Sequence, residues 1–179
     1  MLVTGAFGLV GSATVRRLAA IDRRVMATDL DTPANRKGAA RLPAGVEARW
    51  VDLTDSVEVT RLVSEVAPAA IVHLAGIIPP LIYRNAKLAR RVNVNGTAAL
   101  VSAAQTQPNP PRFVLASSTA VYGARNPHRV KALLCADTPV RPCDLYGAHK
   151  ADVENHVRSS SLEWVVLRLG GVRASTPEP

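Results

Sequence analysis

Gly5-Ala6-Phe7-Gly8-Leu9-Val10-Gly11 is the stretch that decides the fold of this 179-residue chain. It follows a short apolar segment, Met1–Thr4, and precedes Leu9–Ile21, where apolar residues recur at helical spacing. In such a loop the first glycine permits a tight turn, the second admits a pyrophosphate and the third allows close packing of helix on strand. We therefore predict a dinucleotide site at this helix N-terminus, formed by Gly5, Phe7, Gly8, Leu9 and Gly11.

Apolar runs of strand length alternate with longer helical stretches along the rest of the chain. We predict strands at Met1–Thr4, Val25–Asp29, Ala48–Val51, Ala70–Leu74, Arg112–Ser117 and Trp164–Leu169. We predict helices at Leu9–Ile21, at Asp55–Val66 with Thr54 or Asp55 as its cap, at Ala86–Gln107 with a bend near Gly96, and at Asp144–Ser160. Repeated strand–helix units predict an α/β fold, a doubly wound parallel sheet of the Rossmann type in three α/β/α layers.

The bulk composition is that of one globular domain. Apolar residues make up 47% of the chain and charged residues 20%, and we expect residues 1–173 to form an NAD(P)-binding domain and residues 174–179 a flexible tail. No apolar run approaches the roughly 18 residues that cross a bilayer, and no signal peptide precedes Gly5, so we expect a cytoplasmic protein without membrane contact. Cys135 and Cys143 lack metal-ligand spacing, and no metal is predicted.

The net charge of +8 raises the question of nucleic acid. The basic residues are scattered, and aromatic residues, which could stack on bases, make up only 4% of the chain. We therefore expect a solvated basic surface that attracts an anionic nucleotide, and no nucleic-acid partner.

Asp29 ends the second predicted strand, 18 residues after Gly11. A carboxylate at this place accepts hydrogen bonds from the adenine ribose and repels a 2′-phosphate, which favours NAD over NADP. Arg36 and Lys37 weaken that preference, because either side chain could fold back onto a phosphate. A glycine turn without a ligand is the alternative interpretation. Asp52 ends the third strand at the same edge of the sheet, where it could equally be a turn residue.

Tyr146 and Lys150 are four residues apart, which places them on one face of the predicted helix. A lysine ammonium beside a tyrosine, together with a positive nicotinamide ring, would stabilise the phenolate and make it usable as a base near neutral pH. Ser117 and Ser118 close the fifth strand, where a hydroxyl could orient the reacting oxygen towards Tyr146.

With these residues the chain resembles the extended short-chain dehydrogenase/reductase superfamily, in particular its NAD-dependent epimerase/dehydratase family, which acts on nucleotide sugars. The resemblance is carried by motifs that follow one another along nearly the whole chain: Val3–Gly11, Asp52-Leu53, His73–Gly76, Asn93–Thr97, Ser117–Gly123 and Tyr146–Lys150.

The resemblance implies a role for each matching position. Asp52 and Leu53 would contact adenine, Asn93 would hold the middle of the site through its helix, and the cofactor path would be lined by Leu74, Ala75, Gly76 and Ser117. Ser118 matches the catalytic serine or threonine, with Thr119 as the alternative; Tyr146 would be the acid/base, and Lys150 would bind the nicotinamide ribose. Hydride transfer between NAD and a carbinol of a small substrate, a nucleotide sugar, is the implied reaction, and a homodimer is left open.

Two other functions stay open. Enzymes of this family usually continue for a hundred residues or more beyond the sixth strand, so we expect the C-terminal substrate domain to be absent from this chain. A non-catalytic or truncated NAD-binding module is therefore one alternative. A dehydrogenase acting on steroid- or flavonoid-like alcohols, which shares the same motifs, is the other.

Overall fold

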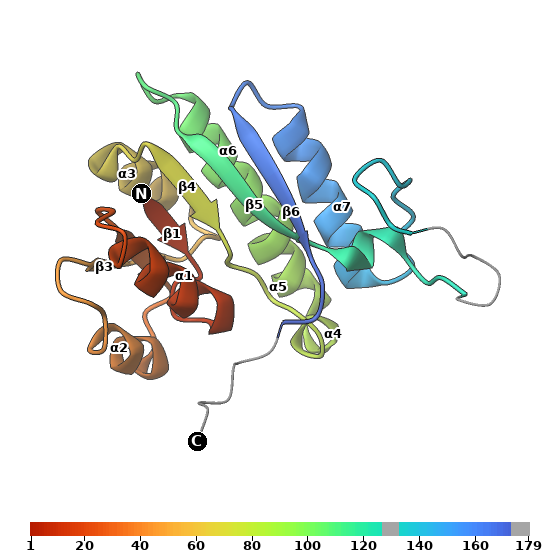
Figure 1. Cartoon of the computed structure of the whole chain (residues 1–179), viewed down its shortest axis with the longest axis horizontal. Helices are drawn as coiled ribbons and strands as arrows, with labels where there is room; N and C mark the ends of the chain where they lie inside the picture. The colour runs from red at the N-terminus through yellow and green to blue at the C-terminus, as the bar shows by residue number, and fades with distance from the viewer. Residues whose placement is uncertain (127–132, 173–179) are drawn as a thin grey trace.

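The computed structural model describes residues 1–126 and 133–172 (Figure 1). Within them, six parallel strands form one sheet in the order β3-β2-β1-β4-β5-β6. The strands are β1 (Leu2–Thr4), β2 (Met26–Asp29), β3 (Glu47–Trp50), β4 (Ala70–His73), β5 (Arg112–Ser118) and β6 (Trp164–Leu169). All six predicted strands are confirmed to within one residue at each end. The predicted tail, residues 174–179, lies outside the described residues.

The predicted helices are present, and one of them is interrupted. They are α1 (Leu9–Ala19), α3 (Ser56–Val66), α5 (Ala86–Arg90), α6 (Thr97–Gln105) and α7 (Leu145–Arg158). Asp55 caps α3, because its side chain accepts hydrogen bonds from the N–H groups of Val57 and Glu58. Asp144 caps α7 in the same way through Gly147.

The predicted single helix Ala86–Gln107 is divided between α5 and α6 by η1 (Arg91–Gly96), a π-helical turn. Gly96 ends that turn, so the interruption lies where a bend was predicted. A methyl group on Gly96 would lie 3.0 Å from the carbonyl oxygen of Leu53, so a larger residue would push the helix and this loop slightly apart.

The sequence analysis did not predict three short elements, α2 (Pro33–Ala39), α4 (Leu81–Arg84) and η2 (Thr119–Tyr122). Because α2 buries none of its residues, it has no apolar stripe to show in the sequence. The helices α4 and η2 have four residues each, too few for a period to be recognised.

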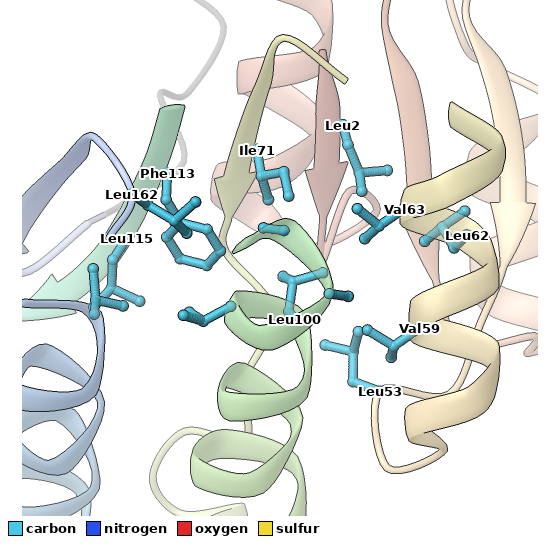
Figure 2. Packing of buried hydrophobic residues seen from close by; sticks show 14 of the residues in the cluster. Leu2, Leu53, Val59, Leu62, Val63, Ile71, Leu100, Phe113, Leu115 and Leu162 are labelled. Carbon is cyan, nitrogen blue, oxygen red and sulfur yellow. The ribbon is translucent and has the colours of Figure 1, made fainter. Parts of the chain in front are cut away.

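Helices cover both faces of the sheet, which confirms the three-layer fold. On one face, Leu2, Ile71 and Phe113 of the strands pack against side chains of α3, α6 and α7, among them Leu62 and Leu100 (Figure 2). On the other face, a smaller cluster joins Val3 and Ala27 to Val15 of α1.

The outer strand β6 has a different environment on each face. Trp164 and Val166 pack on the larger core cluster. The alternate residues Val165 and Leu167 point to the opposite face and are 37% and 46% exposed. Among residues 1–126 and 133–172 this strand pairs with β5 alone, so it forms one edge of the sheet that they build.

Candidate active site

The carboxyl ends of β1 and β4 meet at the middle of the sheet, where successive connections switch direction. Ligands of open α/β sheets bind in the crevice at such a switch point. Two cavities of about 330 and 320 Å³ lie there, here called the first and second cavity. Both are lined by Gly5, Gly8, Leu74 and Gly76, so they form two halves of one crevice.

Each glycine of the loop has its own structural reason. Gly5 has a φ of +65°, and a methyl group there would lie 2.6 Å from the backbone nitrogen of Ala75. A methyl group on Gly11 would collide with the carbonyl oxygen of Gly5. At Gly8 the nearest atom would be that same oxygen at 3.5 Å, an ordinary contact. Gly8 therefore leaves space for a ligand, whereas the other two permit the fold.

The start of α1 suits an anion. Its N-cap is Gly8, no side chain caps it, and its first turn contains no acidic residue. The N–H groups and the positive end of the helix dipole are thus left for a ligand, as a pyrophosphate requires.

Asp29 connects this loop to the end of β2. Its carboxylate accepts hydrogen bonds from the N–H groups of Phe7 (3.2 Å) and Leu30 (2.9 Å) and lines the first cavity. A carboxylate has about four acceptor positions, so Asp29 can still accept bonds from ribose hydroxyls. The Phe7 ring, by contrast, packs on Trp50 with 5.3 Å between ring centres, and Phe7 is not among the residues that line either cavity.

The first cavity contains most of the predicted cofactor residues. Its wall includes Asp29, Asp52, Leu53, Leu74, Ala75 and Gly76. Thr28 also lines it, and within the described chain its buried hydroxyl oxygen has no hydrogen-bond partner. An unsatisfied buried hydroxyl is costly, and a nucleotide in this cavity could satisfy it. The residues present therefore fit an adenosine group, and Thr28 is a site residue that the sequence analysis missed.

Asn93 acts on the site indirectly. Its side chain accepts a bond from the Ile77 N–H (2.7 Å) and donates one to the Ile77 carbonyl (2.8 Å), so the π-helical turn holds the loop after β4. Ile77 lines the first cavity. The predicted role of Asn93 in supporting the middle of the site agrees with this geometry.

The second cavity brings together the predicted catalytic residues Ser118, Tyr146 and Lys150, with Leu9 and Gly11 of the glycine loop. The Ser118 hydroxyl is near enough to the Tyr146 phenol to lower its pKa. The Lys150 ammonium lies 5.7 Å from the centre of the Tyr146 ring and donates a bond of 2.7 Å to the carbonyl of Ala116. This arrangement can pass a proton to or from an oxygen atom at the cavity wall.

The pKa values of this group follow from burial. Burial raises the pKa of the Tyr146 phenol above its ordinary value, and the nearby Ser118 hydroxyl opposes part of that effect. Among the protein groups alone the loss of water therefore determines the direction, and the stabilisation of the phenolate by Lys150 together with a nicotinamide ring stays a prediction. Burial lowers the pKa of the Lys150 ammonium to about 8, so that it remains largely charged at neutral pH.

Ser117 lines the second cavity, but its hydroxyl points to the helix side and donates a bond of 2.5 Å to Glu154. Glu154 also accepts three bonds from Arg168, the shortest 2.7 Å, and is almost completely buried. Burial alone would raise the pKa of Glu154, but Arg168 and Ser117 hold it below its ordinary value. Arg168 further donates to the Tyr122 hydroxyl at 2.8 Å, which joins η2, β6 and α7 behind the site.

His73 has a structural role. Its ring contacts the hydroxyls of Thr4 (2.6 Å) and Thr97 (2.8 Å), and Thr97 donates its own proton to the carbonyl of Asn93. Nε2 of His73 therefore carries the proton and Nδ1 accepts one from Thr4. Burial lowers the pKa of His73 to about 3, so the ring is neutral and packed.

Residues 1–126 and 133–172 contain neither a candidate metal site nor a helix that could span a membrane. This part of the chain contains no group of three acidic, histidine or cysteine side chains placed to hold a metal ion. It also contains no helix with the length and apolar character that crossing a bilayer requires.

A crevice at the switch point, a glycine loop and a Ser–Tyr–Lys group together define a dinucleotide-binding domain of the short-chain dehydrogenase/reductase type. Residues 1–178 match the NAD dependent epimerase/dehydratase family, and the chain belongs to that family. The predicted family and its cofactor, NAD, are confirmed.

Individual relatives match nearly the whole chain. It is 28% identical to D-erythronate dehydrogenase of Cupriavidus necator, over all of this chain and 57% of that protein. It is 30% identical to UDP-glucose 4-epimerase 4 of Oryza sativa subsp. japonica, over 94% of this chain and 47% of that protein. The solved structure of Thermus thermophilus UDP-glucose 4-epimerase with NAD is similar with a TM-score of 0.81 at 31% identity, over 93% of this chain and 53% of that one. The chain thus spans about half the length of these relatives.

Proposed function

We propose that this chain forms the cofactor-binding and catalytic part of an NAD-dependent enzyme that oxidises a carbinol of a nucleotide sugar, with Tyr146 as the acid/base. The observation that carries the proposal is that Ser118, Tyr146 and Lys150 line one cavity, with the Lys150 ammonium 5.7 Å from the centre of the Tyr146 ring. The similarity to UDP-sugar epimerases supports the substrate class.

In this mechanism the protein groups bind, orient and move one proton. Bound NAD supplies the acceptor for the hydride. Ser118 donates a hydrogen bond to the substrate oxygen and directs it to Tyr146, whose phenolate removes the hydroxyl proton. The Lys150 ammonium, 5.7 Å from the Tyr146 ring centre, stabilises the phenolate against the effect of burial. The net charge of +8 attracts an anionic substrate to the crevice.

A simple dehydrogenase is the second candidate, because D-erythronate dehydrogenase matches the whole chain. The two reactions differ in cofactor balance. An epimerase returns the hydride to its substrate, so NADH does not accumulate, whereas a dehydrogenase releases NADH. Hydroxy acids such as erythronate are also anions, so charge does not distinguish the candidates.

The test is a panel of UDP-sugars and sugar acids, with NAD binding measured by calorimetry and products followed by chromatography and NADH absorbance. We expect epimer formation without accumulated NADH. Tyr146→Phe removes one oxygen atom while it keeps the ring, so turnover should fall by about 10²–10⁴-fold with NAD affinity nearly unchanged.

Each other outcome contradicts part of the proposal. Accumulated NADH with a sugar acid supports the dehydrogenase. NAD binding without turnover of any substrate supports a non-catalytic module. Full activity of Tyr146→Phe removes Tyr146 from the mechanism. A homodimer stays a prediction, to be measured by sedimentation.

A further inference from the structure

Arg36, near the adenosine end of the crevice, is already paired with a carboxylate. Nε and Nη2 of Arg36 donate hydrogen bonds of 2.6 and 2.7 Å to the two oxygens of Asp31. This is the bidentate geometry in which a guanidinium also binds a phosphate. While Asp31 is bound there, this side of the guanidinium is occupied and its charge is neutralised, so Arg36 attracts another anion less strongly.

The pair lies beside the first cavity. Asp31 follows Asp29 and Leu30, which both line that cavity. The Arg36 guanidinium lies 5.6 Å from the centre of the Trp50 ring, and Trp50 directly precedes Val51 and Asp52 on the cavity wall. Leu30 is tied to the same helix as Arg36, because its carbonyl accepts a bond of 2.9 Å from Asn35.

We propose that Asp31 is a specificity-determining residue, which keeps Arg36 from neutralising the 2′-phosphate of NADP and so strengthens the preference for NAD. Asp29 stands where such a carboxylate reads the ribose 2′ position. A 2′-phosphate would therefore meet the Asp29 carboxylate, which lines the first cavity. Arg36 is the cation that could offset the negative charge of the phosphate, and it is paired with Asp31.

Because the Asp31–Arg36 pair is exposed, a substitution of Asp31 alone should release Arg36. The side chains of Arg36 and Asp31 are 62% and 49% exposed, and an ion pair in water is stabilised only weakly. Without the Asp31 carboxylate, the Arg36 side chain therefore remains charged and hydrated, and it can reach a phosphate. The inference requires only that the first cavity holds the adenosine end of the dinucleotide, and it does not depend on the proposed role of Tyr146.

The test is calorimetric measurement of Kd for NAD and for NADP, at one fixed ionic strength, with the whole chain. We expect Asp31→Ala to bind NADP about five- to tenfold more tightly than the wild type, the scale of one exposed charge-assisted contact. NAD affinity should change by less than about twofold, because NAD has no 2′-phosphate for Arg36 to meet.

Controls separate a released arginine from a lost negative charge. Asp31→Ala/Arg36→Ala should lose the gain in NADP affinity, whereas Asp31→Ala/Lys37→Ala, which removes the neighbouring cation, should keep it. Equal NADP affinity of Asp31→Ala and Asp31→Ala/Arg36→Ala would overturn the proposal, as would no gain in Asp31→Ala. Turnover does not enter these measurements, so loss of the catalytic proposal would leave their result intact.

Discussion

Two alanine substitutions in the glycine loop should have different effects: Gly11→Ala should lower the stability of the fold, and Gly8→Ala should lower the affinity for NAD. In Gly11→Ala the new methyl group meets backbone atoms, the Gly5 carbonyl and the Ala6 Cα at 2.8 Å, which cannot rotate away. Overpacking of this kind costs about 3 kcal/mol. The better helix propensity of alanine offsets about 1 kcal/mol of that. The net loss of about 2 kcal/mol should lower Tm by about 4–8 °C for a chain of this length.

Gly8→Ala is the matched control, because its methyl group has 3.5 Å to the nearest atom. The backbone at Gly8, with φ −71° and ψ 175°, suits alanine, and an N-cap change of this type costs less than about 1 kcal/mol. Gly8 lines both cavities, so the methyl group occupies ligand space, and we expect NAD affinity to fall at least about tenfold.

Thermal unfolding without ligand and calorimetric titration with NAD measure the two effects separately. The reasoning is refuted if Gly8→Ala binds NAD like the wild type, since the crevice then does not hold the pyrophosphate. It is equally refuted if Gly11→Ala unfolds at the wild-type temperature, since the contact with Gly5 would then not exist in solution.

Three further predictions concern buried polar groups. Because the pKa of His73 is lowered to about 3 from 6.5, the unfolded chain binds one more proton than the folded chain below pH 6.5. As the pH is lowered through this range, the free energy of unfolding should therefore decrease by up to about 1.4 kcal/mol per pH unit. Urea titrations should show a weaker dependence of that free energy on pH for His73→Asn. The pKa of Lys150 is about 8 against 10.5 in the unfolded chain, so between these values the wild type should gain stability with rising pH relative to Lys150→Met; parallel curves would contradict the burial of its charge. Glu154→Gln leaves Arg168 without its buried partner and should cost about 3–5 kcal/mol, whereas Glu47→Gln, at an ion pair whose side chains are 90% and 51% exposed, should cost less than about 1 kcal/mol in the same urea titration.

The sequence predicted the parts of the fold that depend on local chemistry. The continuous apolar run at Ala70–His73 and the Asp55 cap were recognisable because a buried parallel strand and a helix start each require particular residue types. Helix α2 was missed since none of its residues is buried. The π-helical turn η1 was not predicted as such, because its residues fit an ordinary helix in the sequence.

In the site, residues in motifs were found and residues outside motifs were not. Thr28 lies inside a strand and Glu154 inside a helix, and only the three-dimensional structure shows an unsatisfied hydroxyl in one and a buried ion pair at the other. The effect of burial on the Tyr146 pKa was not predicted, because the loss of water around a side chain cannot be read from spacing.

The open face of β6 has a practical consequence for handling the protein. An edge strand offers unpaired N–H and C=O groups to any other strand, and here Val165 and Leu167 add exposed apolar surface beside them. Edge-to-edge aggregation is the general hazard of such a strand, and high salt would favour it by screening repulsion among the chain's excess positive charges. A lysine in place of Val165 should therefore improve solubility at high concentration without disturbing the crevice, which Val165 does not line.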